Sequence, residues 1–432
     1  MHICRKWRRI VFASQRALQL RPLFTHGTPV LKTLDCWPTL PIVVRYGGST
    51  GLDPPTPEDE GNIIAALKHS DRVTSIWLTV TRSLLKRVSA IKRPFSELEE
   101  LVLLSQDSVP VTLPIAFRWG PRLRRLRWTR IAFPALLHLL CSSKNLVDLQ
   151  LHEVLNLWHF SPEVLTNALS GMVQLRSLSL HFRPSPGYRT APSPPVERIV
   201  LPDLSRFNFR GNAQYLEGFV ARKDAPRLWD IEVSFVDEII FELQALSVFI
   251  DRIPMHKSYR RADILSSEHQ ISITLTQPGA PTCLKFRLLC EKLSYQVLSM
   301  TRICTDCSAF LFNVEDLRIS AERPSRQEGL YNEQWLEPIN SFTDVKWLHV
   351  SGNLSTNVIS SLLRPGRRPA SVLPSLHKLY IPQPGPCYAP LREAVVSFMV
   401  TRRLAGHPIV VEYERLRHIN ELPGTGTVLD RC

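Results

Sequence analysis

The residues that could support catalysis occur in only a few places in the chain. Residues 47–51 (GGSTG) match the Gly-x-Ser-x-Gly pattern of a hydrolase nucleophile, and Ile42 to Tyr46 is a predicted strand before it. That nucleophile requires a helix directly after it. Residues 52–55 (LDPP) follow instead, and their prolines block a helix. We therefore interpret the glycine run as a turn and do not predict a serine hydrolase.

A second motif is Cys304-x-x-Cys307, with Cys283 and Cys290 upstream. A structural zinc site requires two closely spaced pairs, and the spacing of the upstream cysteines does not supply the second pair. Apolar residues precede Cys304 at helical spacing, at Leu293, Val297, Met300 and Ile303. The sequence therefore predicts buried free thiols on a helical face and no metal.

Other signatures of catalysis or cofactor binding are missing from the sequence. There is no phosphate-binding glycine loop of the Walker or dinucleotide type. The histidines are dispersed and lack the spacing of zinc hydrolases, as at His138, His152, His159 and His181. We predict neither an enzyme nor a cofactor.

Composition indicates a globular protein in a reducing compartment. The chain has 432 residues, of which 44% are hydrophobic, so it can bury a sizeable core. Its nine cysteines have no framework spacing, which favours free thiols and a cytoplasmic or nuclear location. No apolar run is long enough to span a membrane. The basic N-terminus, whose first acid is Asp35, leaves a mitochondrial presequence as an alternative.

Net charge is +14, which is compatible with nucleic acid, an acidic partner or an anionic membrane surface.

The elements that would position a binding surface follow from an internal repeat. The pattern is apolar-x-x-apolar-x-apolar, and it recurs every 23–31 residues except across one gap of 86 residues. Its copies begin at Val73, Leu98, Leu123, Leu146, Leu175, Leu204, Leu228, Val314, Val345 and Leu376. The long gap fits about three further units, with degraded strands at Ile271–Thr276 and Cys283–Leu288. Such periodicity is typical of a repeat protein whose units must stack to bury their apolar faces.

Helix-like segments separate the strands, at Glu58–His69, after Ser161-Pro162-Glu163 and at Asn353–Leu363. The predicted fold class is therefore α/β, an irregular leucine-rich-repeat-like solenoid (horseshoe). Most copies lack the asparagine that holds the turn in the standard repeat; Asn212 and Asn353 are the exceptions.

Four segments organise the chain. We predict an N-terminal cap over residues 1–20 and a linker with a short strand over residues 21–60. The repeats occupy residues 61–400. A final strand at Ile409–Tyr413 and a tail lie within residues 401–432.

Side chains alternate along a strand, so residues between the apolar positions should form an exposed, concave face. Two patches are predicted on it. One is basic and centres on residues 120–130, where Arg125 and Arg127 point outward; Arg206 and Arg210 extend it. The other is aromatic and joins Trp347, His349 and Tyr380. Trp77 occupies an equivalent outward position. We predict these eight residues as ligand-binding, with ordinary solvent exposure as the alternative.

Residues 4–11 (CRKWRRIV) resemble the last helix of an F-box, where a Cys-basic-x-Trp-x-x-Ile run is common. Residues 12–18 also fit, and repeats of this type follow. The chain is therefore similar to the fungal F-box/leucine-rich-repeat-like proteins. In that family the F-box docks on the Skp adaptor of a cullin–RING ubiquitin ligase, and the repeats hold the substrate.

The resemblance implies that Cys4, Trp7, Ile10 and Val11 are an adaptor-binding remnant. An F-box has three helices and this sequence begins at the third, so the F-box is expected to be truncated. An amphipathic cap over the first open edge of the repeats is a compatible interpretation of the same residues.

The expected function is a protein-interaction module, the substrate-recognition part of an F-box (SCF-type) ubiquitin ligase subunit. Its expected partners are an unknown protein substrate and a Skp-type adaptor, with no membrane. The alternatives are a basic solenoid that binds phosphorylated ligands or nucleic acid, and an orphan scaffold. Nucleic acid is the less favoured ligand because the acids Glu100, Asp148, Asp230 and Asp316 share the face with the arginines.

Overall fold

The structure is a computed structural model. It describes residues 10, 20–36, 40–47, 55–105, 114–130, 134–154, 161–182, 198–236, 239, 242–290, 293–321, 336–351, 354–363, 372–382 and 389–414. The chain divides into two compact units. Unit 1 comprises Met1–Lys257 and Thr282–Leu284, and unit 2 comprises Ser258–Pro281 and Lys285–Cys432. The repeat region predicted over residues 61–400 therefore contains the boundary between the two units.

Unit 1 alternates strands and helices. Its strands are β1 (Leu23–Phe24), β2 (Ile42–Tyr46), β3 (Val73–Val80), β4 (Glu100–Ser105), β5 (Arg125–Thr129), β6 (Asp148–Val154), β7 (Ser177–Phe182), β8 (Ile199–Val200), β9 (Arg206–Gly211), β10 (Lys223–Asp224) and β11 (Asp230–Phe235). Its helices are α2 (Val30–Cys36), α3 (Pro57–Leu67), α4 (Arg82–Val88), α5 (Pro134–Ser142), α6 (Pro162–Leu169), α7 (Ala213–Val220) and α8 (Gln244–Asp251), with 3-10 turns η1 (Ile115–Phe117) and η3 (Pro254–His256).

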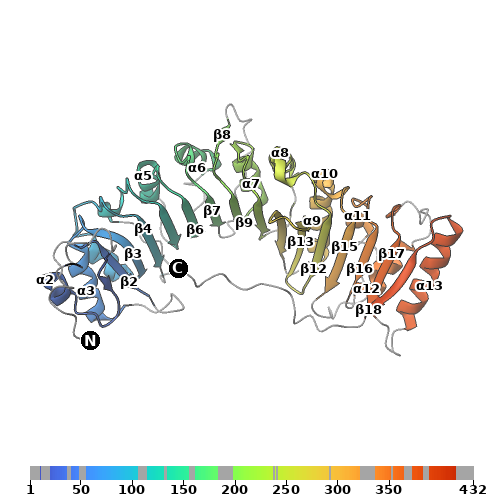
Figure 1. The fold of residues 1–432 in the computed structure, drawn as a ribbon, viewed down its shortest axis with the longest axis horizontal. Coiled ribbons are helices and arrows are strands. Elements are labelled where there is room, and N and C mark those ends of the chain that lie inside the picture. Colours follow the sequence, from blue (N-terminus) through green and yellow to red (C-terminus); the bar gives the residue numbers. More distant parts are fainter. Residues whose placement is uncertain are drawn as a thin grey trace. The chain divides into compact units, whose positions relative to one another are not determined.

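The sheet of unit 1 is parallel, in the order β1-β2-β3-β4-β5-β6-β7-β9-β11. Helices α5, α6 and α7 lie on one side of these strands (Figure 1). The short strands β8 and β10 form a separate parallel pair. Parallel neighbours require a crossover segment between them, and the intervening helices supply it.

Unit 2 contains strands β12 (Arg261–Ser266), β13 (Gln270–Thr276), β15 (Asp316–Ala321), β16 (Trp347–Val350), β17 (Lys378–Pro382) and β18 (Val410–Glu414); β14 (Cys283–Leu289) contains the boundary between the units. Its helices are α9 (Leu293–Asp306), α10 (Ser308–Leu311), α11 (Leu336–Ile339), α12 (Leu354–Leu362) and α13 (Ala389–Leu404). The sheet order is β13-β12-β15-β16-β17-β18. All pairs are parallel except β12–β13.

The strands predicted from the apolar pattern are confirmed. Each of the ten copies contributes to a strand, β3 to β7, β9, β11 and β15 to β17. All of their apolar pattern positions are buried, including the large Trp128 of β5. Burial of these side chains against the crossover helices is the main stabilising contribution to each strand. The mixed α/β fold with mostly parallel strands was therefore predictable from the spacing of apolar residues.

The two strands predicted in the 86-residue gap, at Ile271–Thr276 and Cys283–Leu288, are confirmed as β13 and β14, but the prediction that strand–helix repeat units fill the gap was wrong. Strand β12 was not predicted, and it pairs in parallel with β15. Strand β13, at the predicted Ile271–Thr276, runs antiparallel to β12 after a short connection. The two form a hairpin because only three residues, Ser267 to His269, separate them, which is too few for a helical crossover.

Capping residues mark the start of two helices of unit 1. Ser161 accepts a hydrogen bond from the backbone N–H of Val164 and so caps α6, with Pro162 at its first position. Asn212, predicted to hold a turn, caps α7 by accepting from the N–H of Gln214 at 2.7 Å. Its predicted counterpart Asn353 lies outside the described residues.

Residues 21–60 contain regular structure that joins the sheet. Strand β2 pairs with β3, and β1 pairs with β2. The predicted strand at Ile42–Tyr46 is confirmed as β2. Ser49 and Gly51 of the GGSTG motif lie outside the described residues.

Helix α9 carries the predicted thiol. Cys304 is fully buried, as are Val297, Met300 and Ile303 on the same face. Burial raises the pKa of the Cys304 thiol, so it is inert as a nucleophile. Within the described parts of the chain, no group of three or more His, Cys, Asp or Glu residues could hold a metal ion. None of the helices described is both long and apolar enough to cross a membrane.

Asp59 connects the start of α3 to the segment before β2 through hydrogen bonds. Its carboxylate accepts from the N–H and hydroxyl of Thr56, which completes a capping box. It also accepts from the ring of His26, Nδ1 to Oδ2 2.8 Å, and from the N–H of Gly27. Burial alone would raise the pKa of Asp59, but the hydrogen bonds from His26, Thr56 and Gly27 outweigh it, and the pKa lies below its usual value.

We expect Asp59→Asn to destabilise unit 1 by about 1–2 kcal/mol at pH 7. Because the folded-state pKa is lowered, this stabilisation is complete above the unfolded-state pKa, which is near 4, and is lost as pH falls through the folded-state pKa. The difference in urea midpoint between the variant and the unmodified chain should therefore shrink below about pH 4. The exposed first-turn acid Glu58 is the control: Glu58→Gln should change the midpoint little.

Candidate functional site

The polar face of unit 1 consists of three rows of side chains that run across the strands in register. The first row contains Ser75, Glu100, Arg125, Asp148, Ser177, Arg206 and Asp230. The second row contains Trp77, Val102, Arg127, Gln150, Ser179, Asn208 and Glu232. The third row contains Thr79, Leu104, Thr129, His152, His181, Arg210 and Ser234. Residues about 25 positions apart in sequence thus become neighbours about 4.8 Å apart.

A groove of about 320 Å³ crosses this face over strands β6, β7, β9 and β11. It is lined by polar side chains of all three rows, namely Gln150, His152, Ser177, Ser179, His181, Arg206, Asn208, Asp230 and Glu232, and by Leu178 and Phe207. The groove offers hydrogen-bond donors, acceptors and charges of both signs. That composition suits a polar or charged ligand better than an apolar one.

A chain of hydrogen bonds connects the centre of the groove. The amide of Asn208 donates to Glu232, which leaves its Oδ1 to accept from His181 Nε2 at 3.2 Å. Ser179 Oγ lies 3.4 Å from the same His181 nitrogen and 3.3 Å from His152 Nε2. If His181 Nε2 carries the proton, Ser179 accepts from it and donates to His152 Nε2. The proton of His152 then resides on Nδ1.

The two histidine rings are stacked, with centroids 4.3 Å apart and planes 9° from parallel. Burial, the neighbouring His181 and the Arg127 cation lower the pKa of His152 to about 4. Burial also lowers the pKa of His181, which Arg127 and Arg210 lower further against the opposing effect of Asn208 and Glu232. The pair is therefore neutral at physiological pH, which allows the rings to stack without charge repulsion.

The predicted basic residues divide into two kinds. Arg125 lies 3.6 Å from Glu100, and Arg206 lies beside Asp230 in the register, so acids accompany both. In the described part of the chain, Arg127 and Arg210 have no acidic partner. The Nε of Arg127 is buried without a hydrogen-bond partner.

Trp77 lies outside the groove. The Arg45 guanidinium stacks over its ring, 4.6 Å from the ring centroid. The indole is therefore engaged in a cation–π contact within the sheet face.

The predicted aromatic patch belongs to unit 2 and is described by itself. His349 stacks on Tyr380 with centroids 4.1 Å apart and planes 3° from parallel. Trp347 is exposed and lies beside Lys378 in the register. The structure thus brings His349 and Tyr380 into contact and places Trp347 on the adjoining row.

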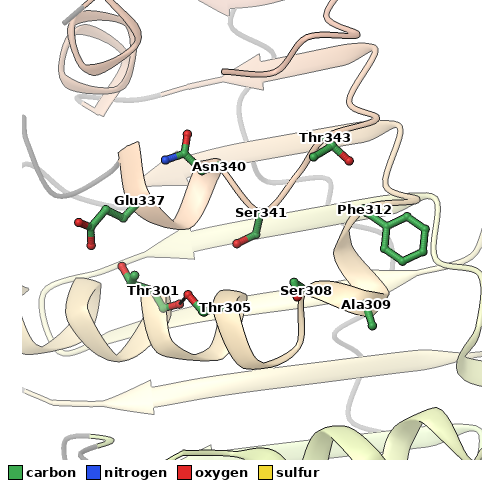
Figure 2. Close-up of a pocket in the computed structure, with 9 residues that line it drawn as sticks. All are labelled: Thr301, Thr305, Ser308, Ala309, Phe312, Glu337, Asn340, Ser341 and Thr343. Carbon is green, nitrogen blue, oxygen red and sulfur yellow. Dashed lines mark hydrogen bonds between the residues drawn. The ribbon is translucent and has the colours of Figure 1, made fainter. Parts of the chain in front are cut away.

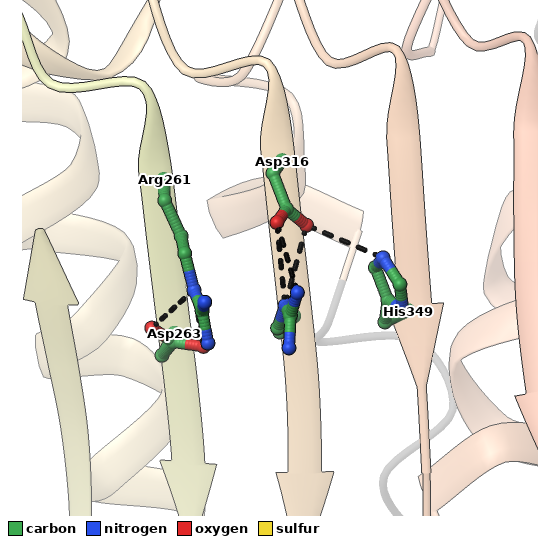
Figure 3. Close-up of polar contacts among 5 residues, drawn as sticks. Arg261, Asp263, Asp316 and His349 are labelled. Carbon is green, nitrogen blue, oxygen red and sulfur yellow. Dashed lines mark hydrogen bonds and ion pairs between the residues drawn. The ribbon is translucent and has the colours of Figure 1, made fainter. Parts of the chain in front are cut away.

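Acids and arginines accompany this patch, including Asp316, which was predicted to lie on the same face. His349 Nε2 lies 3.4 Å from Asp316 Oδ1, and Arg261 pairs with Asp263 on the neighbouring strand (Figure 3). Arg318 donates to Asp316, so the carboxylate is shared between a guanidinium and an imidazole. In contrast to Arg127 and Arg210, these arginines are paired within their own strands.

A second pocket, of about 670 Å³, lies among α9, α10 and α11 in unit 2. Figure 2 shows its lining, which is rich in hydroxyl groups and includes the aromatic ring of Phe312. The hydroxyls of Thr301 and Thr305 donate to carbonyls one turn earlier in α9. They can therefore serve a ligand only as acceptors. The sequence patterns did not indicate this pocket.

The predicted adaptor-binding residues Cys4, Trp7 and Val11 lie outside the described residues. Ile10 is described, and 47% of its surface is exposed.

Sequence reasoning missed His152 and His181 because it searched for metal-ligand spacing. A usable signal was present. Each histidine directly follows the last apolar position of its repeat copy, and the two copies are consecutive. Residues at equal positions in consecutive copies are neighbours in a parallel sheet, so the pair could have been predicted. No protein-family model matches the chain, and no curated protein matches it.

Proposed function

We propose that the chain is a leucine-rich-repeat-like solenoid that binds a protein partner, and that it is the substrate-recognition part of an F-box (SCF-type) ubiquitin ligase subunit. The observation that carries the first part is the register of the polar face. Three rows of mostly polar side chains run across seven parallel strands of unit 1, beside pattern positions that are uniformly buried. The outward side chains of such a face can be substituted without changing the buried core, which is the basis of recognition by repeat proteins.

The ligase part of the proposal is supported by the resemblance of residues 4–11 to the last F-box helix. The protein acts by binding and not by catalysis. Free thiols at Cys36, Cys141 and Cys304 support a location in the cytoplasm or nucleus.

Biolayer interferometry with a purified Skp-type adaptor at physiological salt tests the ligase assignment. We expect micromolar or tighter binding by the full chain, and a loss of at least about tenfold in Trp7→Ala, because a large aromatic side chain is the usual anchor of such an interface. Trp347→Ala, on the strand face of unit 2, is the matched control and should bind as the unmodified chain does. Absence of binding would remove the ligase assignment and leave an orphan repeat scaffold.

One observation favours a second candidate, a solenoid that recognises phosphorylated ligands. Arg127 and Arg210 are the arginines of the polar face without acidic partners among the described residues. Guanidinium groups in this state are available to an external anion. Nucleic acid is less favoured because Asp148, Asp230 and Glu232 line the same face and repel an extended phosphate backbone.

A further inference from the structure

The last strand of unit 2 leaves part of the core uncovered. Strand β18 pairs with β17, and no other strand among the described residues pairs with its opposite edge. Tyr413 is the register neighbour of Ile381, so the two side chains point to the same side of the sheet. Ile381 is buried, whereas 53% of the surface of Tyr413 is exposed. A position that is buried one strand earlier is therefore open at this end of the sheet.

Helix α13, which precedes β18, carries an apolar stripe opposite its core contacts. The helix packs against α12 and buries Leu391, Val395 and Phe398. At 3.6 residues per turn, Val396 and Val400 point about 160° away from Phe398 around the helix axis. Both valines are exposed, as are two further apolar side chains beside them. We refer to the four exposed residues as the α13 stripe: Val396, Met399, Val400 and Leu404.

The stripe and the open edge of β18 lie on consecutive elements, separated by residues 405–409. Figure 1 draws α13 and β18 at the end of the unit 2 sheet. The terminal unit of a repeat array needs a polar outer face, because no further unit covers its apolar side chains. Here the terminal helix exposes apolar residues instead, which is typical of an interaction surface.

Charged residues flank the stripe symmetrically. Glu393 lies five residues before Phe398, and Arg403 lies five residues after it, both on the same side of α13 as the stripe. Both side chains are exposed, and neither forms an ion pair with another described residue. In an antiparallel pair of α13 helices centred at Phe398, Val396 would face Val400 of the second copy. Glu393 would then face Arg403 of the second copy, at both ends of the contact.

We propose that a second copy of the chain docks on the α13 stripe, with the two α13 helices antiparallel about a two-fold axis. A two-fold interface joins a surface to itself, so that surface must be complementary to its own copy. The stripe meets this condition, because an acid flanks its apolar centre on one side and a base flanks it on the other. A partner of another kind would not require this symmetry.

The edge of β18 favours the same occupant. An unpaired edge offers backbone N–H and C=O groups to another strand. Two copies of one strand that are related by a two-fold axis across the strand pair antiparallel, as the two helices do. The second copy would also cover Tyr413. This self-association goes beyond the proposed recognition of a partner by the polar face of unit 1 and does not depend on it.

Sedimentation velocity of the full chain, from about 1 to about 100 µM, tests the proposal. We expect a dimer with a dissociation constant on the order of micromolar, because one helix pair and one strand edge form a small interface. Val396→Glu/Val400→Glu should weaken dimerisation at least about tenfold, because it places unpaired charges in the apolar centre of the contact.

The matched control is Val173→Glu/Val248→Glu. It introduces the same charges at two valines of unit 1 that are 55% and 46% exposed, compared with 54% and 52% for Val396 and Val400. The control should change the dissociation constant by less than about twofold, because exposed charges outside the interface act only through a screened field. Circular dichroism establishes that each variant is folded.

Reversal of the flanking charges tests the antiparallel arrangement. Glu393→Arg alone should weaken dimerisation at least about fivefold, because it opposes like charges at both ends of the contact. Adding Arg403→Glu reverses both partners and restores the attraction. Glu393→Arg/Arg403→Glu should therefore return the dissociation constant to within about twofold of that of the unmodified chain.

Three results would overturn the proposal. A monomer throughout the concentration range would show that no second copy docks. Equal dissociation constants for the two double valine variants would show that the stripe is not the interface. Failure of Glu393→Arg/Arg403→Glu to recover the affinity lost in Glu393→Arg would exclude the antiparallel pairing of α13.

Discussion

Arg402→Met should lower the stability of unit 2 by about 3 kcal/mol, a large effect for a single substitution. Arg402 lies on α13, and none of its surface is exposed. Its guanidinium donates to the backbone carbonyls of Val372, Leu373 and Leu376, in the segment that leads into β17. The side chain thus connects the last long helix of unit 2 to the preceding strand.

The size of the effect follows from what the substitution leaves behind. Methionine fills most of the volume of the arginine stem, so the cavity contribution is small. The three carbonyls belong to buried residues and would lose a charged donor without gaining water. Each buried acceptor left unsatisfied costs about 1–3 kcal/mol. Burial of the guanidinium is itself unfavourable and lowers the pKa of Arg402. The methionine variant avoids this cost, which offsets part of the loss.

Urea unfolding followed by circular dichroism measures this effect, with hydrogen exchange of α13 amides as a local readout. Arg403→Met is the matched control, since Arg403 is the next residue of the helix and is exposed. It should change the free energy of unfolding by less than about 0.5 kcal/mol. Equal midpoints for the two variants would contradict the connecting role assigned to Arg402.

The repeat pattern allowed the strands and the outward rows to be predicted for a physical reason. A strand of this sheet buries alternate side chains, as Leu126 and Trp128 of β5 show. This alternation is visible in the sequence as alternating apolar residues. The same alternation is sufficient to predict that Arg127 and Arg210 lie on the polar face. Residues in equal positions of consecutive copies became neighbours as expected.

The hairpin β12–β13 was not predicted because its strands carry no copy of the pattern. In Arg261–Ser266 only Ala262 and Ile264 occupy buried alternate positions, and the apolar Leu265 between Ile264 and Ser266 interrupts the alternation. Such a short alternation is too weak to distinguish a strand from a loop. The direction of a strand is not encoded in its own residues, so antiparallel β13 could be assigned only from the short connection.

Pairing among charged side chains was the least predictable part of the site. The sequence does not distinguish the four arginines of the polar face. Among the residues that the structure describes, Arg125 and Arg206 face acids. Arg127 and Arg210 do not. That difference depends on which residue occupies the neighbouring strand. It therefore requires the register, in addition to the outward direction of each side chain.

Each unit contains a pair of stacked rings that occupy the same position in two consecutive repeat copies. In unit 1 His152 stacks on His181, and in unit 2 His349 stacks on Tyr380. The spacing of parallel strands, about 4.8 Å, is close to the separation at which flat rings contact each other. In unit 1 burial, and to a smaller extent the neighbouring arginines, lower the pKa of the imidazoles, whereas in unit 2 the partner of His349 is the carboxylate of Asp316. The two faces thus present different electrostatics on the same backbone geometry.

Glu217→Ala should destabilise unit 1 by about 2–3 kcal/mol, because Glu217 caps a helix that has no cap of its own. Helix α8 begins after Leu243, whose side chain forms no capping hydrogen bond. The buried carboxylate of Glu217, on α7, accepts from the N–H of Ala245 at 2.7 Å and of Leu246 at 2.9 Å. A negative charge at this end of a helix also interacts favourably with the helix dipole.

The alanine variant would leave two backbone donors unsatisfied at a site that side chains shield from water, and it would remove the link between successive helices of unit 1. Glu217→Gln keeps one acceptor oxygen, so it should destabilise unit 1 by about half as much as Glu217→Ala does. Asp251→Asn, at the exposed C-terminal end of α8, changes the charge equally and should be neutral or slightly stabilising, since an acid there opposes the dipole. Urea midpoints and exchange rates of the Ala245 and Leu246 amides measure the series. If these two amides exchanged no faster in Glu217→Ala than in Asp251→Asn, the capping role of Glu217 would be refuted.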